Sequence, residues 1–220
     1  MTIVIRRILP AILFALALLS VAPDTVLAAA KVEAARLNPA DAADVARVED
    51  YLNAIRTMRS RFFQVAPSGA QAEGEILLAR PGRLRIAYDP PTPILIVANG
   101  PTVGYYDREI KQAQYLGTDM TPAGILVREK IKFTGGDLLV TRFERGQGAL
   151  RLTLARADDP GAGSIALVFS ETPLTLRKWY VHDAQGQTTE IALLGPQFGV
   201  EIAPKLFLFD EMVENKPANN

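Results

Sequence analysis

The fold of this chain is decided by the stretch Gly74-Glu-Ile-Leu-Leu-Ala-Arg-Pro-Gly-Arg-Leu-Arg-Ile-Ala-Tyr-Asp-Pro-Pro91, which reads as two β-strands joined at a corner, Arg80-Pro81-Gly82. Side chains alternate along a strand, so residues of one parity share one face of the sheet. One face carries Ile76, Leu78, Arg80, Leu84, Ile86 and Tyr88, and the other carries Arg83, Arg85 and Ala87. The first face is large and apolar with one guanidinium set into it. This pattern indicates a surface that encloses an apolar ligand and is fastened at one polar point.

The N-terminal segment has the layout of an export signal. Arg6 and Arg7 precede an apolar run over residues 8–19, and small residues follow at 26–28 and 28–30. The run is shorter than the roughly 20 residues that a membrane-spanning helix needs. We expect a signal peptide over residues 1–28 with cleavage near Ala28 or Ala30, the alternative being an uncleaved anchor. Because the sequence has no Cys, the chain is not itself expected to be lipidated.

Composition excludes several classes of protein. Cleavage removes Arg6, Arg7 and Asp24, which leaves 22 basic and 23 acidic residues. This balance gives no basic excess for binding nucleic acid or an anionic membrane surface. The remaining chain, about 190 residues, has the size of one domain. Without Cys, its stability in an oxidising compartment must come from packing and hydrogen bonds.

Residue patterns predict two helical segments. Asn38 can cap free amides and Pro39 suits a first helical position, so a helix of about five turns is expected to begin there. Its apolar stripe is formed by Val45, Val48, Leu52, Ile55 and Met58. Thr121 and Pro122 signal the start of a second, shorter helix that extends to about Arg128.

The rest of the chain reads as about ten strands separated by turns. The first set is predicted at 61–65, 73–79, 84–88, 94–98, 103–106 and 112–116, with Asn99-Gly100 as a hairpin turn. The second set is predicted at 138–144, 149–155, 164–169, 174–182 and 188–194, and its spacing suggests a meander. Residues 206–209 are either a last edge strand or a turn of helix. We expect a flexible leader over 29–38, one domain over 39–213 and a polar tail over 214–220.

The sequence offers no catalytic or metal-binding constellation. His182 is the only histidine, and no Gly-x-Ser-x-Gly motif supplies a nucleophile for it. One His without any Cys cannot build a zinc site, and no acidic run has the spacing of a calcium loop. We therefore expect a protein that is not an enzyme and that uses neither metal nor cofactor.

The central region resembles LolA-type outer-membrane lipoprotein carriers. The resemblance rests on Arg80-Pro81-Gly82-Arg83-Leu84-Arg85, Tyr88, Pro91, Ile96-Val97-Ala98-Asn99-Gly100 and Tyr105-Tyr106-Asp107, with Phe62-Phe63-Gln64 upstream and residues 121–126 downstream. It covers roughly residues 40–130, and the C-terminal third matches only in its strand-rich pattern. About ten strands and two helices already exclude a doubly wound fold. The resemblance implies an α+β fold, in which a strongly curved antiparallel sheet forms an incomplete β-barrel with a helical lid over an apolar cavity.

The resemblance also implies a role for Arg80, because the family has there the arginine that hydrogen-bonds the backbone carbonyls of the lid. The alternative is a solvated Arg at a strand end. A buried guanidinium needs acceptors, since an unpaired buried charge costs several kcal/mol. Carbonyls at the end of the Thr121 helix or of the first helix are both candidates. This lid latch is our first expected site.

The second expected site is the apolar cavity under the lid. We predict that it is lined by Leu52, Ile55, Ile76, Leu78, Leu84, Ile86, Tyr88, Ile96, Tyr105, Ile125 and Leu126. Leu84 stands where the family usually has Phe, and Gly124 thins the lid, so a somewhat wider cavity than usual is expected. The alternative for all these residues is an ordinary filled core.

The function implied by the resemblance is transport of acylated lipoproteins in the periplasm. A soluble monomer would take them from an inner-membrane ABC-type release complex and pass them to an outer-membrane acceptor. A second hypothesis is a protein that binds or transfers another lipid, such as a phospholipid or a polycyclic membrane lipid. A third is an envelope scaffold with a filled core, which predicts no ligand and no response to mutation of Arg80.

Overall fold

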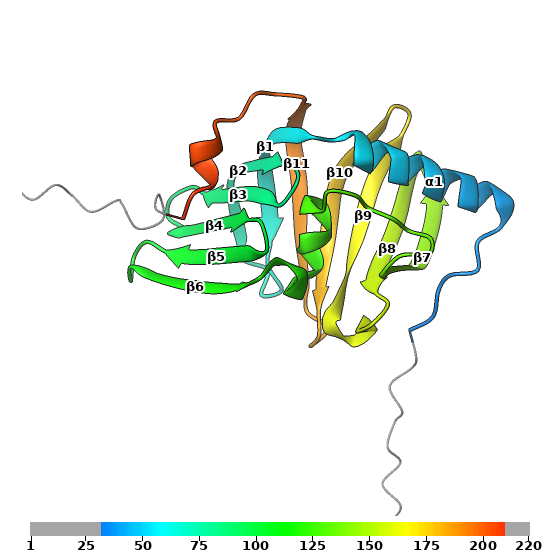
Figure 1. Cartoon of the computed structure of the whole chain (residues 1–220), viewed down its shortest axis with the longest axis horizontal. Helices are drawn as coiled ribbons and strands as arrows, with labels where there is room; N and C mark the ends of the chain where they lie inside the picture. The colour runs from blue at the N-terminus through cyan, green and yellow to red at the C-terminus, as the bar shows by residue number, and fades with distance from the viewer. Residues whose placement is uncertain (1–31, 210–220) are drawn as a thin grey trace, which may run out of the picture. The chain divides into compact units, whose positions relative to one another are not determined.

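A computed structural model describes residues 32–209 of the chain. The expected signal peptide with its cleavage site and the expected polar tail lie outside the described residues. Residues 32–209 form one antiparallel sheet of 11 strands, one α-helix and four short 3₁₀ helices. This architecture confirms the predicted α+β fold, an unclosed curved sheet with helical cover (Figure 1).

The sheet consists of two meanders that meet in its middle. The first contains β1 (Thr57–Val65), β2 (Gln71–Ala79), β3 (Arg83–Tyr88), β4 (Ile94–Asn99), β5 (Thr102–Asp107) and β6 (Gln112–Gly117). The second contains β7 (Leu138–Gly146), β8 (Ala149–Arg156), β9 (Gly163–Glu171), β10 (Leu174–Asp183) and β11 (Thr188–Phe198). The strand order is β6-β5-β4-β3-β2-β1-β11-β10-β9-β8-β7. The first strand of the domain therefore pairs with the last, in a register that runs from Met58 opposite Phe198 to Val65 opposite Glu190.

The long helix, α1 (Pro39–Ala54), begins as predicted and ends early. The Asn38 side chain accepts the Asp41 N–H at 2.9 Å, and Pro39 is the first helical residue. The apolar stripe was predicted to continue to Met58, but Met58 lies in β1. From Thr57 onward the backbone pairs with β2 and then with β11. Hydrogen bonds between these strands take the place of the expected last helical turn. Met58 is still buried, but as a residue of the sheet and not of the helix.

The short helices complete the connections between strands. They are η1 (Thr118–Met120), η2 (Pro122–Val127), η3 (Pro160–Ala162) and η4 (Pro204–Phe207). The predicted second helix is thus a 3₁₀ helix, and its predicted cap is present: Thr121 Oγ1 accepts the Gly124 N–H at 3.1 Å. The segment around 206–209 contains a turn of helix, which decides the alternative left open by the sequence.

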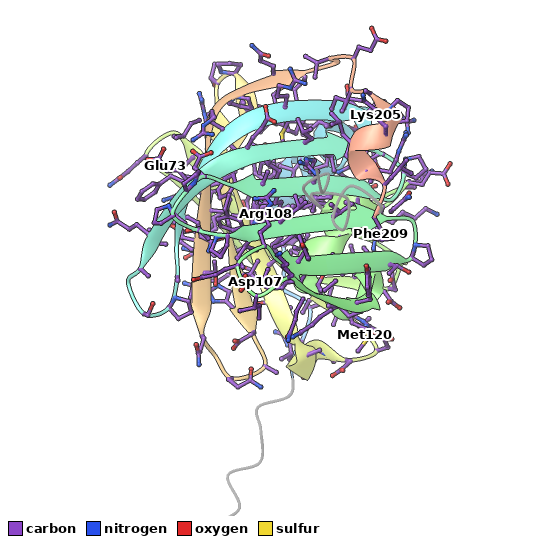
Figure 2. The ribbon with its side chains drawn as sticks, turned by 90° about the vertical axis from the view of Figure 1, so that its left-hand side faces the viewer. Glu73, Asp107, Arg108, Met120, Lys205 and Phe209 are labelled. Carbon is purple, nitrogen blue, oxygen red and sulfur yellow. The ribbon has the colours of Figure 1, made fainter. Side chains whose placement is uncertain are left out.

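The main core lies between the sheet and its helical cover. In Figure 1, α1 crosses the strands β7–β10, and η2 lies over the middle of the sheet. Fully buried side chains of this core include Leu52, Phe62, Ile76, Ile131, Leu150, Leu152 and Phe169. Two smaller apolar clusters lie on the opposite face of β2–β6, where residues 202–209 cover Leu77 and Leu95. Lys205 and Phe209 mark this covering segment in Figure 2.

Candidate ligand-binding site under the lid

Arg80 connects the sheet to both parts of the lid. It follows β2 and is only 6% exposed. Its Nε donates a hydrogen bond to the Leu126 carbonyl of η2 at 2.8 Å, and its Nη1 donates to the Leu52 carbonyl of α1. Its backbone N–H bonds the Arg56 carbonyl at 2.8 Å. One guanidinium therefore holds two lid elements that lie 74 residues apart between Leu52 and Leu126.

The positive charge of Arg80 is stabilised by the dipoles of the carbonyl groups that it contacts. Burial lowers the pKa of Arg80 to about 10, and the nearby positive charge of Arg56 acts in the same direction. The group still carries its proton at pH 7. Both acceptors lie near the C-terminal ends of helical segments, where the helix dipole is negative. The strength of this contact depends on both carbonyls staying in place.

The predicted cavity residues come together, but the space between them is filled. Leu52, Ile55, Ile76, Leu78, Leu84 and Leu126 surround, with Arg80, a void of only about 10 Å³. Such a void holds at most about one water molecule. Ile125 is buried in the same cluster, and Ile86, Tyr88 and Ile96 are half-buried against it. The protein is therefore closed in this structure, and an open cavity stays a prediction.

Tyr105 is the one predicted lining residue that lies outside this cluster. It pairs with Ile96 across β4 and β5, so it belongs to the predicted face, yet its side chain is 39% exposed. The cause is position: β5 is next to the edge strand β6, and Tyr105 lies further along it than Val103, which is buried in the main core. Alternation identified the face correctly, but it carried no information on how far the lid extends.

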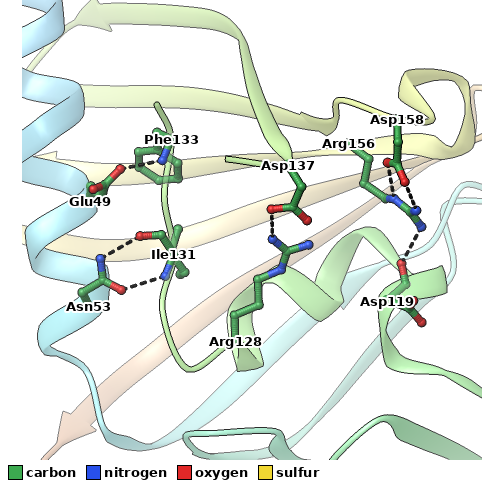
Figure 3. A network of polar contacts seen from close by, with 9 residues as sticks. All are labelled: Glu49, Asn53, Asp119, Arg128, Ile131, Phe133, Asp137, Arg156 and Asp158. Carbon is green, nitrogen blue, oxygen red and sulfur yellow. Dashed lines mark hydrogen bonds and ion pairs between the residues drawn. The ribbon is translucent and has the colours of Figure 1, made fainter. Parts of the chain in front are cut away.

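The two lid elements are also tied to each other through the segment after η2 (Figure 3). The Asn53 side chain on α1 donates to the Ile131 carbonyl and accepts the Ile131 N–H, both at 2.9 Å. Glu49, one turn earlier, accepts the Phe133 N–H. Sequence reasoning missed both residues, because they lie on the polar side of α1 and their partners are about 80 residues away. The lid is thus one connected unit.

A larger cavity lies on the other side of η2 and was not predicted from the sequence. It has a volume of about 420 Å³ and is lined by η1, η2, the turns at Gly82 and Gly100, and the end of β8. Of the predicted lining residues, it includes Ile125. At its rim Arg128 pairs with Asp137 at 2.7 Å, and Arg156 pairs with Asp158 at 2.6 Å (Figure 3). These guanidinium groups lower the pKa of the Asp137 and Asp158 carboxyls below the usual value.

Gly124 makes the close approach of η1 and η2 possible. A Cβ at this position would lie 2.0 Å from the Thr118 carbonyl oxygen, far inside contact distance. We expect Gly124→Ala to push η2 away and to lower the stability by about 1–3 kcal/mol, the usual cost of overpacking. Urea unfolding of the purified protein measures this loss. Gly146→Ala is the matched control, because no heavy atom lies within 4 Å of its added Cβ. Equal stability of the two variants would contradict the close packing of the lid.

His182 Nδ1 lies 2.8 Å from Thr188 Oγ1 across the β10–β11 hairpin. Within residues 32–209 no cluster of His, Asp or Glu could hold a metal ion. In the same range, no helix is long and apolar enough to cross a bilayer.

Comparisons with known proteins agree with the resemblance in the central region and extend it. The family described as "Outer membrane lipoprotein carrier protein LolA" matches residues 53–210. A relative from Azotobacter vinelandii named outer-membrane lipoprotein carrier protein is 28% identical over 184 residues, which span 77% of this chain and 85% of the relative. A Legionella pneumophila protein of the same name is 28% identical over 171 residues, 74% of this chain and 83% of its own length. Among solved structures, a LolA superfamily protein from Nitrosomonas europaea aligns with a TM-score of 0.44 at 13% identity, over 76% of this chain and 98% of its own.

Proposed function

The chain belongs to the LolA family of outer membrane lipoprotein carrier proteins, and from this premise we propose that it carries acylated lipoproteins through the periplasm. It would receive them from an inner-membrane ABC-type release complex and deliver them to an outer-membrane acceptor. In this role the protein is a monomeric binding protein with no catalytic step. The names of the relatives that match most of the chain support the class of cargo.

The observation that carries the proposal is the closed state held by Arg80. The concave face is apolar, its own side chains fill it, and Arg80 fastens both lid elements over it. Cargo can enter only when the lid moves and those side chains separate. Binding of acyl chains is therefore set against re-formation of a packed core with two buried hydrogen bonds.

The free energy of burying acyl chains explains why competition between cargo and the closed state is useful. Each buried methylene contributes about 0.8 kcal/mol, so full burial of three long acyl chains would exceed the practical limit on affinity, roughly 20 kcal/mol. A protein that bound its cargo so tightly could not pass it on. A closed state that competes with cargo subtracts its own stability from the binding free energy. The filled concave space supplies this competing state.

The proposal is tested by what the protein carries when it is purified from the periplasm under mild conditions. We expect mass spectrometry to find proteins with an acylated N-terminal cysteine, and N-terminal sequencing to place the start of the carrier near residue 29 or 31. Copurified phospholipid or a polycyclic lipid without lipoprotein would instead assign the protein to another lipid. An empty protein that binds no fluorescent acyl probe would mean that the closed core is permanent, as in a scaffold.

A further inference from the structure

The two edges of the sheet differ in how they are protected. An edge strand exposes unpaired backbone groups, and proteins protect it with charges, bulges or covering segments. The edge strand β7 has all three: Arg142, Glu144 and Arg145 in its sequence, a register shift after Val140, and a hydrogen bond from the Ala35 N–H to the Val140 carbonyl. Its Arg145 also pairs with Asp44 of α1. The edge at β7 is therefore closed to further strands.

Along its outer edge, β6 has no charge, bulge or hydrogen-bonded segment among the described residues, while Phe209 packs against the Tyr115 ring on one face of the strand, with ring centroids 5.4 Å apart. Its sequence is Gln-Ala-Gln-Tyr-Leu-Gly, without a charged residue. Tyr115 is 52% exposed and Leu116 is 37% exposed. Within residues 32–209, β6 pairs with β5 alone. An uncharged, exposed edge of this kind is a template for another extended chain.

The backbone groups that face outward on β6 can be assigned. Thr118, directly after the strand, donates its N–H to the Pro101 carbonyl on the β5 side. In an antiparallel ladder both polar groups of a residue point the same way, and the direction alternates along the strand. Gln114 and Leu116 therefore direct their groups at β5, whereas Ala113 and Tyr115 direct theirs away from the sheet. An added strand would pair with these two residues.

The chain leads directly from this edge into the wall of the larger cavity. Leu116 stands opposite Val103, so it lies on the concave face that the lid covers further along the sheet. Residues 118–121, which directly follow β6, line the 420 Å³ cavity beside η2. Met120, 69% exposed, lies in this stretch, near the end of the sheet in Figure 2. A ligand with an apolar end in the cavity would thus leave it next to the β6 edge.

We propose that β6 binds the extended peptide next to the acylated end of the cargo by strand addition. This proposal rests on the proposed carrier function and adds a second contact to it. Cargo proteins that differ in their folded domains share an acyl group and the backbone beside it. Strand addition forms hydrogen bonds with a backbone of any sequence, with side chains adding selectivity. The uncharged β6 adds no charge of its own that would reject particular cargo sequences.

The test compares synthetic ligands on the full-length protein. One ligand is an S-diacylglyceryl-cysteine amide, and the other carries an uncharged tail of eight residues. We expect the tail to increase affinity about tenfold, which corresponds to about 1.4 kcal/mol. Two further peptides carry N-methyl groups on alternate backbone nitrogens of the tail, one on the odd and one on the even positions. Only one side of an added strand faces β6, so one of these peptides should lose the increase in affinity and the other should keep it.

The same hydrogen bonds can be tested by a substitution in β6 of the carrier. Ala113→Pro removes an outward N–H while the β5 ladder is kept, and Ala113→Val is the control that retains the N–H. The tail should no longer increase the affinity for Ala113→Pro, whereas it should still do so for Ala113→Val. If the amide without a tail fails to bind, the carrier function fails and this proposal with it. If that amide binds but the tail adds nothing, or both methylation parities act alike, strand addition is wrong. A concentration-dependent dimer that Ala113→Pro abolishes would assign the edge to a second copy and also overturn the proposal.

Discussion

Arg80→Leu is expected to give a protein that folds and loads cargo but releases it at least tenfold more slowly than the wild type. Leu keeps the apolar stem and removes the donors to the Leu126 and Leu52 carbonyls. Hydrogen bonds from a charged donor contribute about 1.5–3 kcal/mol each. Since 1.4 kcal/mol is a factor of ten, the loss of two such bonds is enough for this change. The closed state weakens, so cargo binds more tightly and leaves more slowly.

The closed state is the folded state without cargo, so the same variant should lose stability by an amount comparable to its gain in cargo affinity. The two carbonyls lose a partner, which costs stability if they stay buried. The variant also no longer buries a guanidinium whose pKa is lowered to about 10 by desolvation. This relief offsets part of the cost of the two lost hydrogen bonds, so the variant should still fold. A cooperative thermal melt of Arg80→Leu at a moderately lower temperature than that of the wild type is the expected result.

The measurement for Arg80→Leu is transfer of a labelled lipoprotein from purified carrier to acceptor membranes. Arg83→Leu is the matched control, because that guanidinium lies over the Phe207 ring, on the other face of the sheet. The control should transfer at the rate of the wild type. Normal transfer by Arg80→Leu would refute the latch. A large loss of stability without bound cargo would show instead that Arg80 is a structural ion.

Leu84→Ala is expected to lower the stability by about 2–5 kcal/mol, the usual cost of truncating a buried side chain. Leu84 is 8% exposed and borders a void of only about 10 Å³, so the truncation opens a hole in a packed core. In a protein whose cavity stood open, the same change would cost much less, because water would already contact this side chain. Urea unfolding distinguishes the two cases.

The control for Leu84→Ala is Leu116→Ala, the same truncation at a residue that is 37% exposed. Leu116→Ala should lower the free energy of unfolding by much less than Leu84→Ala does. If both variants lose the same small amount, the concave space is open in solution and the closed state is a minor one. The enlarged void of Leu84→Ala should also admit a fluorescent acyl probe more readily, because the closed state that competes with the probe is weaker.

Local patterns were enough to predict most elements of this fold. All eleven predicted strands appear with bounds within about four residues of those expected, and Asn38 and Thr121 cap the segments for which they were predicted. Period-two alternation placed Arg80 on the same face as Ile76 and Leu78, where it is found buried. These features depend on near neighbours in the chain, which is why a single sequence determines them. The same stretch also carried the resemblance to the family, which the comparisons confirmed.

The tertiary structure decided what depends on distant segments. The end of α1 at Ala54 follows from the pairing of β1 with β11, more than 120 residues away. The acceptors of Arg80, the bonds from Asn53 to Ile131 and the burial of Leu77 by the C-terminal segment are contacts of the same kind. Whether the concave space is open or filled is a further case, since a void is the difference between the volume that a curved sheet encloses and the volume of the side chains packed into it. The sequence by itself determined an apolar face with one arginine; only the packing of lid on sheet decided that the arginine binds two lid carbonyls over a closed core.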